Sequence, residues 1–176
     1  MTATEYIQLV NEDDQPVGIM EKLSAHRAAL LHRAVSVLLF NSAGELLLQQ
    51  RARGKYHSGG LWTNTCCTHP RPEEDPLTAA RRRLEEEMGI CCDPEYRFKF
   101  IYKAVLDQGL AEHELDHVFF AFSDQVPAPD PGEVAAWRYL SLPALKQELA
   151  ERPESFSAWL PLIVEQMKIE NYVYPF

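Results

Sequence analysis

The stretch DPLTAARRRLEEEMGI, residues 75–90, carries a full set of helix signals. Asp75 can cap the first turn, and Pro76 suits the first helical position because the N–H that proline lacks has no intrahelical partner there. Gly89 stands just past the end, where a left-handed residue often closes a helix. The apolar residues between these signals recur at helical spacing: Leu77, Ala80, Leu84 and Met88. The sequence therefore predicts one amphipathic helix over residues 75–88.

Strand patterns lie on both sides of this helix. Residues 34–40 (AVSVLLF) and 45–51 (ELLLQQR) are two β-type runs separated by the turn residues 41–44 (NSAG), which is the pattern of a hairpin. We also expect strands at residues 6–10, 96–106, 114–123 and 134–140, and helices at about residues 142–149 and 155–168. Residues 11–18 are typical of a turn, and residues 127–131 of a loop within the domain.

The composition limits the class of protein. The 176 residues suffice for one compact domain with its own core, and the 46% hydrophobic and 24% charged content is that of an ordinary soluble protein. The longest apolar stretch, residues 34–40, is too short to span a membrane. A formal charge of −9 opposes binding to nucleic acid or to an anionic membrane surface, so an anionic substrate would need a local basic pocket.

The cysteines and the first residues indicate the compartment. Cys66-Cys67 and Cys91-Cys92 are adjacent pairs, which fit neither a secreted disulfide framework nor a zinc knuckle, so we expect reduced thiols. Residues 1–15 lack the basic and apolar regions of a secretory signal. We therefore expect a cytoplasmic protein.

Imidazoles and carboxylates provide a possible metal site. His26, His32 and His69 precede or follow predicted strands, and each taken alone is more typical of an ordinary core or surface histidine. Glu112 and Glu114 alternate along a probable strand, so both carboxylates can face one point, although a solvated strand face is the simpler account of such a pair. If they converge, these five residues suit Mg²⁺, Mn²⁺, Fe²⁺ or Zn²⁺.

A thiol lies two residues from one of these histidines. In an extended segment Cys67 shares a face with His69 while Cys66 faces the other way. A cysteine is usually a small buried apolar residue, but a nearby cation would favour the thiolate and suit Cys67 for proton transfer.

Basic residues are spread over the same region. Successive residues of a helix fan out by about a hundred degrees, so at most two of the run Arg81, Arg82 and Arg83 can face one ligand. An intrahelical pair between Arg83 and Glu87 is the simpler account of that arginine. The other candidates for an anionic ligand are ordinary surface charges when each is considered alone: Lys22, Arg51 and Lys55.

The segment RRRLEEEMGI, residues 81–90, resembles half of the Nudix box, R-E-U-x-E-E-x-G-U, where U is a bulky aliphatic residue. Glu74 and Arg82 keep their expected positions, but Thr68 stands where the box begins with Gly, and Arg83 replaces the first Glu of this half. In Nudix hydrolases that Glu belongs to the metal cluster that activates water, so its replacement counts against pyrophosphate hydrolysis. Glu86 and Glu87 remain as possible ligands.

A narrower resemblance accounts for these departures. The order and spacing of several segments look like type I isopentenyl-diphosphate isomerases from about residue 22 to residue 159: Glu21-Lys22, His26, His32, Arg51-Ala52, Trp62-Thr63-Asn64, Cys67-Thr68-His69-Pro70, the degenerate Nudix helix, and Glu112-x-Glu114. The resemblance implies an α/β fold of the α+β type, with mixed β-sheets sandwiched by helices in a single compact domain of residues 1–176. Residues 1–30 would form an N-terminal extension that contributes metal and phosphate ligands.

The resemblance also implies an activity, the interconversion of isopentenyl diphosphate and dimethylallyl diphosphate in isoprenoid biosynthesis. It assigns Cys67 and Glu114 as the catalytic pair, and a metal (Mn²⁺, Mg²⁺ or Zn²⁺) to His26, His32, His69, Glu112 and Glu114. Glu87 would help to hold a Mg²⁺ bound to the diphosphate, and the phosphates would be neutralised by Lys22, Arg51, Lys55 and Arg83. The expected partner is a small isoprenoid diphosphate, with no nucleic acid and no membrane, and the expected state is a monomer or weak homodimer.

The chemistry explains why such groups are needed. Moving the double bond requires an acid and a base on either side of the substrate and a carbocation-like state between the two proton transfers. Water would trap that cation, so the pocket must be dry and lined by aromatic rings, for which Trp159, Trp62 and Tyr102 are candidates beside the simpler interpretation of core packing. The Tyr102 hydroxyl can also assist proton delivery.

Two other functions compete with this one. A Nudix pyrophosphohydrolase would share the fold and the Mg²⁺ requirement, and would release phosphate or pyrophosphate. A non-catalytic protein would use His26, His32 and His69 for a structural metal and carry an inert thiol, so metal removal would unfold it.

Overall fold

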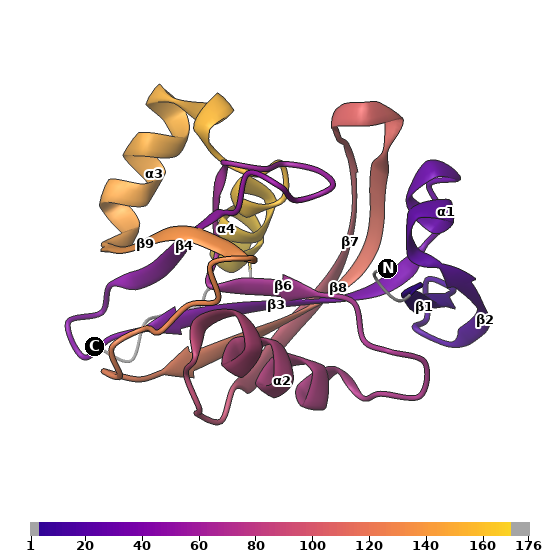
Figure 1. Ribbon diagram of the computed structural model, residues 1–176, viewed down its shortest axis with the longest axis horizontal. Helices are drawn as coiled ribbons and strands as arrows, with labels where there is room; N and C mark the ends of the chain where they lie inside the picture. Colours follow the sequence, from indigo (N-terminus) through magenta and orange to yellow (C-terminus); the bar gives the residue numbers. More distant parts are fainter. Residues whose placement is uncertain (1–3, 170–176) are drawn as a thin grey trace.

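The computed structural model describes residues 4–169, in which a mixed β-sheet carries helices on both faces (Figure 1). The predicted span of residues 1–176 therefore includes ends, residues 1–3 and 170–176, that lie outside the described residues. The strands are β1 (Tyr6–Val10), β2 (Pro16–Glu21), β3 (His32–Phe40), β4 (Leu46–Arg51), β5 (Trp62–Thr63), β6 (Cys66–Thr68), β7 (Glu95–Val105), β8 (Ala111–Phe122) and β9 (Val134–Leu140). The helices are α1 (Lys22–Arg27), α2 (Pro76–Met88), α3 (Leu142–Glu151) and α4 (Leu160–Ile169), with short 3₁₀ turns at Asp107–Gly109 and Pro153–Ser155.

Strand β3 is the centre of the sheet. It runs parallel to β8 along its whole length, from the pair His32–Glu114 to the pair Phe40–Phe122. Its other edge is shared in succession by β1, β6 and β4, all antiparallel to it. Strand β7 adds to β8, and β9 and β5 add to β4. The chemistry-bearing segments around residues 67 and 114 therefore flank one strand.

The two faces of the sheet follow the alternation of side chains in β3. Leu38 and Phe40 point to the face covered by α3 and α4, while Val37 and Leu39 point to the face covered by α2. Figure 1 shows α2 on one side of the strands and α3 and α4 on the other. Burial on both faces explains why this stretch is a nearly continuous apolar run.

The sequence prediction for α2 is confirmed in its details. The Asp75 side chain accepts a hydrogen bond from the Thr78 amide at 3.0 Å, and Gly89 closes the helix with a φ of +65°. The expected strands β7, β8 and β9 are present, with bounds shifted by a few residues at most. Residues 127–131 form the expected loop.

The predicted hairpin is confirmed only at its turn. Asn41 organises the turn, since its side-chain oxygen accepts from the amides of Ala43 at 3.0 Å and Glu45 at 2.9 Å. Beyond the pair Phe40–Leu46 the two strands separate, because β3 pairs with β6 and β8 while β4 pairs with β5 and β9.

Two expected boundaries are wrong. Residues 16–18 belong to β2, because they pair with Leu9 and Val10 of β1, although local sequence favoured a turn over residues 11–18. The last helix begins at Leu160 rather than at residue 155, because the Ser157 amide donates to the Trp62 carbonyl at 2.9 Å and holds the chain extended beside β5. Helix α1 and the short strands β5 and β6 were not predicted as elements.

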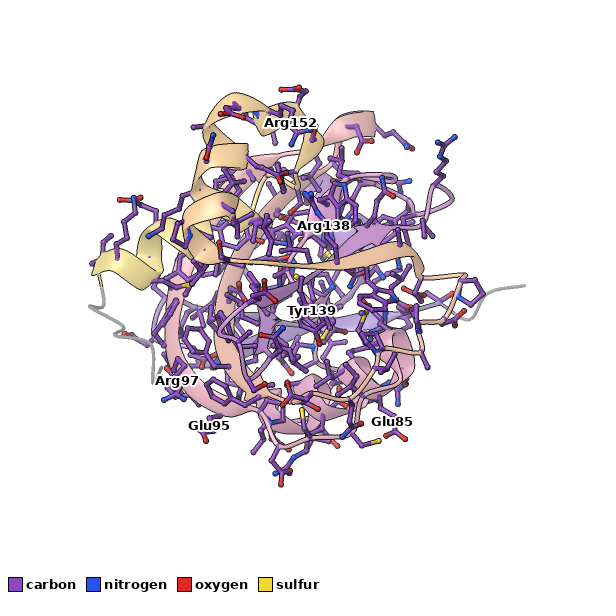
Figure 2. All side chains as sticks on the ribbon, turned by 90° about the vertical axis from the view of Figure 1, so that its left-hand side faces the viewer. Glu85, Glu95, Arg97, Arg138, Tyr139 and Arg152 are labelled. Atoms are coloured by element: carbon purple, nitrogen blue, oxygen red, sulfur yellow. The ribbon has the colours of Figure 1, made fainter. Side chains whose placement is uncertain are left out.

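A charged contact joins β9 to the helical layer through Arg138, which is labelled in Figure 2. Arg138 on β9 donates to the Glu148 carboxylate of α3 at 2.7 and 3.1 Å, and its guanidinium lies over the Trp62 ring at 4.4 Å from the centroid. Arg152 pairs with the same Glu148 at 3.0 Å. Trp62 thus packs against the core on the α3 and α4 side of the sheet. Among residues 4–169, no helix combines the length and the apolar character needed to cross a membrane.

Candidate active site

Three histidines converge from three separate elements. His26 comes from α1, His32 from the start of β3 and His69 from the segment after β6, and their ring centroids lie 4.8 to 5.1 Å apart. The Nδ1 atom of His26 donates to the Lys22 carbonyl at 2.7 Å, and that of His32 donates to the Leu30 carbonyl at 2.8 Å. In the neutral form of each ring, Nε2 therefore carries the lone pair, as in histidines that bind metals.

Two of these nitrogen atoms have no hydrogen-bond partner. His26 and His32 are fully buried, and within the described residues no group forms a hydrogen bond with either Nε2 atom. Unsatisfied buried polar atoms are rare, and an ion is one of their ordinary explanations. Burial lowers the pKa of His26, and it lowers the pKa of His69 to about 3, so both rings are neutral at neutral pH.

Two carboxylates and a phenol complete the cluster. Glu112 and Glu114 project from one face of β8, and Tyr102 from β7 places its hydroxyl 2.9 Å from Glu112 Oε2 and 2.6 Å from Glu114 Oε2. Glu114 Oε1 lies 3.0 Å from His69 Nε2 and 3.5 Å from His32 Nε2. His113 points the other way, toward the carbonyl of Ala29, as the strand alternation predicts.

The surroundings shift the pKa values of the two carboxyl groups in opposite directions. Burial and the charge of Glu114 raise the pKa of Glu112 well above its usual range. Burial alone would raise the pKa of Glu114 too, but the adjacent imidazoles of His69 and His32 hold it well below its usual range. One phenolic proton can serve one acceptor at a time, so Tyr102 can donate to either carboxylate and lies within hydrogen-bond distance of both.

The donor set fits a divalent metal. One ligand atom from each of His26, His32, His69 and Glu114 lies within 4.8 Å of all the others. Imidazole nitrogens combined with carboxylate oxygens suit first-row divalent ions. The structure therefore brings the predicted histidines and Glu114 together as a group that could bind a metal, and Glu112 joins this group through Tyr102.

The Cys67 thiol lies across β3 from this cluster. Its Sγ atom donates to the Asn64 side-chain oxygen at 3.1 Å and lies 3.5 Å from the Ser36 hydroxyl, which donates to Asp116 at 2.7 Å. Cys66 faces the other side of the sheet and packs in the cluster around α2, as the alternation predicts.

With the protein side chains alone the Cys67 thiol keeps its proton, and the expectation that a nearby cation would favour its thiolate stays a prediction. Burial and the charge of Asp116 raise the pKa of Cys67, and burial and Glu114 raise the pKa of Asp116 to about 8. The group is therefore a protonated thiol that can give up a proton. The sequence did not single out Ser36 or Asp116, because both lie inside strands with no motif around them.

Asn64 ties the thiol to an aromatic ring. It is fully buried, and its side-chain oxygen accepts from Cys67 Sγ, from the Thr63 hydroxyl at 3.0 Å and from Trp159 Nε1 at 3.2 Å. Its amide nitrogen donates to the carbonyls of Val37 at 3.1 Å and Cys66 at 2.9 Å. The sequence placed Asn64 within a motif but gave it no role.

A cavity of about 660 Å³ joins these groups. Cys67, Tyr102, Glu112, Glu114 and Trp159 line it, whereas His26 and His32 lie buried behind His69 and Glu114. Trp159 is 2% exposed and belongs to the cavity wall, whereas Trp62 packs under Arg138 outside it.

The cavity lining carries equal numbers of basic and acidic side chains. Six basic side chains line the cavity: Lys22, Arg51, Lys55, Arg71, Arg82 and Arg83. Six acidic ones face them: Glu5, Glu86, Glu87, Glu112, Glu114 and Glu133. Lys22 pairs with Glu5, Lys55 with Glu133 at 2.5 Å, and Arg83 with Glu87. The four predicted phosphate ligands thus share one cavity, and three of them already hold a carboxylate.

Comparison with known proteins places this site in a family. The NUDIX domain family matches residues 30–160. The chain is 52% identical over 162 residues to an isopentenyl-diphosphate Delta-isomerase of Pectobacterium atrosepticum, covering 92% of this chain and 90% of the relative. It is 49% identical over 163 residues to isopentenyl-diphosphate Delta-isomerase 1 of Aromatoleum aromaticum, covering 93% of this chain and 92% of the relative. The chain belongs to the isopentenyl-diphosphate Delta-isomerase family.

The fold of this isopentenyl-diphosphate Delta-isomerase family member is shared more widely. A crystal structure of a protein from Deinococcus radiodurans superposes with a TM-score of 0.76 at 22% identity, covering 92% of this chain and 98% of that one. At that identity the likeness concerns the fold alone, which is the predicted mixed α/β arrangement.

In this family member, the residues shared with the Nudix box keep structural contacts. Arg82 donates to the two carboxylate oxygens of Glu74 at 2.7 and 2.8 Å, which fixes the segment before α2. Burial by itself lowers the pKa of Arg83, but Glu87 and the other carboxylates around it raise that pKa, so it is a permanent cation. Arg83 lines the cavity at the Nudix-box position that holds a metal-binding Glu in the hydrolases.

His57 is a cavity residue that the sequence did not reveal. It lies in the loop between β4 and β5, is 3% exposed, and packs against Trp159 with ring centroids 5.8 Å apart. Burial and the charge of Arg51 lower its pKa to about 3. This loop has no periodic pattern, so sequence offered no signal for its place.

Proposed function

We propose that this chain interconverts isopentenyl diphosphate and dimethylallyl diphosphate, with Cys67 and Glu114 carrying the protons. The single observation behind the assignment of roles is that the Cys67 thiol and the Glu114 carboxylate line one cavity with Trp159 in its wall. Relatives named as isomerases, matched over 90–92% of their length at 49–52% identity, support the reaction itself.

The reaction needs one proton added and one removed. Protonation of the terminal alkene carbon of isopentenyl diphosphate leaves a tertiary cationic centre, and loss of a proton from the carbon nearer the diphosphate forms the new double bond. Cys67 and the Glu114–Tyr102 pair supply an acid and a base on either side of the substrate. Either side can donate in the forward reaction, because the Cys67 thiol and the Tyr102 hydroxyl are both hydrogen-bond donors.

The cavity wall protects the cationic centre. Trp159 offers an aromatic face, and cation–π attraction reaches about 2 kcal/mol in a desolvated site. Its indole N–H is held by Asn64 at 3.2 Å, so the orientation of the ring is fixed before substrate binds. Exclusion of water prevents capture of the cation as an alcohol.

We propose that the buried cluster holds one divalent metal, Mn²⁺, Mg²⁺ or Zn²⁺, through His26, His32, His69, Glu112 and Glu114. The unpartnered Nε2 atoms of His26 and His32 support this assignment. When bound, such an ion neutralises the adjacent carboxylates and fixes the orientation of the Glu114 side chain.

A second ion would accompany the substrate. We propose that Glu87 helps to hold a Mg²⁺ on the diphosphate, while Lys22, Arg51, Lys55 and Arg83 neutralise the phosphate oxygens. Glu87 lies at the cavity wall with one oxygen on Arg83 and the other accepting from Gln49 at 2.6 Å. Residues 4–30 bring Lys22 and His26 to the site, in keeping with an N-terminal extension of a single domain.

We further propose that the protein acts in the cytoplasm as a monomer or weak homodimer on a small isoprenoid diphosphate, without a nucleic-acid or membrane partner. Size-exclusion chromatography with light scattering across a concentration series measures the oligomeric state. A stable higher oligomer at low concentration would contradict that part of the proposal.

NMR of the purified protein with Mg²⁺ and isopentenyl diphosphate in D₂O tests the function. We expect dimethylallyl diphosphate with incorporated deuterium, and loss of conversion in Cys67→Ala and in Glu114→Gln. Release of phosphate or pyrophosphate would favour the hydrolase instead, against which Arg83 in place of the water-activating Glu already argues. Bound metal with no change in the substrate would favour a non-catalytic metal protein.

A further inference from the structure

A buried acid behind Cys67 has no part in the proposed chemistry. Asp116 projects from β8, is fully buried and does not line the cavity. Its Oδ2 atom accepts from the Ser36 hydroxyl at 2.7 Å, whereas its Oδ1 atom has no hydrogen-bond partner among the described residues. A buried carboxyl group with an unpartnered oxygen costs folding free energy, so its presence calls for an explanation.

Ser36 links this acid to the thiol. Ser36 and Cys67 are paired directly across β3 and β6, and their Oγ and Sγ atoms lie 3.5 Å apart. Ser36 is 3% exposed and does not line the cavity, so its hydroxyl is available to neither solvent nor substrate. A hydroxyl has one donor and two acceptor positions. Ser36 can therefore bind Asp116 and Cys67 at the same time.

The other partner of the thiol has no spare capacity. Three donors surround Asn64 Oδ1: the Thr63 hydroxyl at 3.0 Å, Cys67 Sγ at 3.1 Å and Trp159 Nε1 at 3.2 Å. A carbonyl oxygen has two lone pairs, so three donors cannot all bind it well, and an S–H group is the weakest donor of the three. The Ser36 oxygen is a second acceptor within reach of the thiol.

We propose that Ser36 is a positioning residue for Cys67, and that Asp116 holds Ser36 in place by accepting its hydrogen bond. This inference rests on the proposed function, in which Cys67 carries a proton. With Asn64 on one side and Ser36 on the other, the sulfur keeps one rotamer toward the cavity. A displacement of a reacting group by about 1 Å can reduce turnover about 100-fold, so such a restraint matters to the reaction.

The test removes the hydroxyl of Ser36 and leaves the strand intact. In Ser36→Ala, the NMR conversion assay gives kcat and KM, and infrared spectroscopy gives the S–H stretching band of Cys67, identified as the band absent from Cys67→Ala. We expect this band to move to higher wavenumber, because the thiol loses an acceptor. We also expect kcat to fall roughly tenfold or more with KM nearly unchanged, because Ser36 does not line the cavity that takes the substrate.

Two variants separate positioning from other effects. Asp116→Asn keeps a carbonyl oxygen for Ser36 to bind, so it should retain both the band and kcat. Thr65→Val is the matched control, because the buried Thr65 hydroxyl also lies beside β3 but accepts from the Leu39 amide at 2.8 Å and donates to the Leu47 carbonyl at 2.7 Å. It should lower stability and leave the band and kcat of the folded protein unchanged.

Ser36→Ala leaves the Asp116 carboxyl group without its partner, which can prevent folding. In that case the double variant, Ser36→Ala with Asp116→Leu, replaces both polar groups by apolar ones, a change that is close to neutral for stability. It should show the same shift of the band and the same fall in kcat.

A folded protein without the Ser36 hydroxyl that keeps the wild-type kcat would overturn the inference. A fall in kcat with an unmoved S–H band would overturn it too, because Ser36 would then act other than through the thiol. So would an Asp116→Asn protein as slow as Ser36→Ala, because the acid itself would then be required. These results leave the proposed isomerase function intact, whereas a wild type that does not convert isopentenyl diphosphate would overturn that function and this inference together.

Discussion

Replacing Asn64 by alanine should lower both stability and turnover, through two separable effects. Asn64 is fully buried and joins the Cys67 thiol to the Trp159 indole through one oxygen atom. The substitution deprives the Trp159 N–H and the carbonyls of Val37 and Cys66 of this buried partner. At about 1 kcal/mol each, the lower end for an unsatisfied buried group, these losses destabilise the fold by about 3 kcal/mol.

The catalytic effect comes from orientation. Without Asn64 the thiol and the indole no longer share a fixed acceptor, so both can leave the geometry that faces the substrate. A misplacement of about 1 Å can reduce turnover by about 100-fold, so we expect kcat to fall 10- to 100-fold. The KM should change little, because the phosphate-binding side chains do not contact Asn64.

Urea unfolding measures the stability, and the NMR conversion assay measures kcat and KM at a temperature where circular dichroism shows the variant to be folded. Asn41→Ala is the control, since Asn41 also holds a local hydrogen-bond network but at the β3–β4 turn. It should lower stability and leave kcat unchanged. A folded Asn64→Ala protein with wild-type kcat would refute the reasoning.

Three further predictions concern the site and the fold. Tyr102→Phe should lower kcat at least tenfold and leave KM nearly unchanged, because the Tyr102 hydroxyl lies within hydrogen-bond distance of both Glu112 and Glu114. Steady-state kinetics measure both constants, and an unchanged kcat would contradict the prediction. Metal-free protein should lose stability as the pH falls below about 6.5, because burial lowers the pKa of His57 and of His69 to about 3 while the unfolded chain protonates near 6.5. Between the folded and unfolded pKa values, each histidine costs about 1.4 kcal/mol of unfolding free energy per pH unit. Urea unfolding of the chelated protein at pH 7.5 and 5.5 should show a lower midpoint at pH 5.5. Equal midpoints at the two pH values would contradict this prediction. Gly89→Ala should destabilise the fold by about 2 kcal/mol, because φ at Gly89 is +65° and the added Cβ would lie 2.6 Å from the Ala128 carbonyl oxygen. Gly54→Ala is the control, since open space surrounds Gly54 and its stability should not change. Equal urea midpoints for the two variants would contradict this prediction.

Local sequence determines the elements better than it determines their partners. The helix α2 could be predicted to within a residue, because Asp75, Pro76 and Gly89 act on the chain next to them. The β3–β4 turn was equally clear, but nothing local indicates that β3 leaves β4 after one residue pair to lie between β6 and β8. Such pairing is decided by burial on both faces of the sheet, which involves residues distant in sequence.

The same limit applies to the site. Alternation along a strand predicted that Glu112 and Glu114 share a face and that Cys67 faces away from Cys66. The full set of predicted ligands came from resemblance to a family, and the structure brings them to one cavity and the cluster behind it. His57 could not be found this way, because it lies in an aperiodic loop.

The balance of charge around the cavity links the two proposed ions to the departure from the Nudix box. Lys22, Lys55 and Arg83 already hold carboxylates, so a diphosphate must compete with Glu5, Glu133 and Glu87 for them. A cation on Glu87 would release Arg83 toward the phosphates and turn a neutral rim into a positive one. With Glu in place of Arg83, the rim would instead gain a carboxylate and lose a cation, which suits a site that breaks a diphosphate with activated water. Arg83 therefore favours a site that keeps the diphosphate whole while chemistry proceeds at the other end of the substrate.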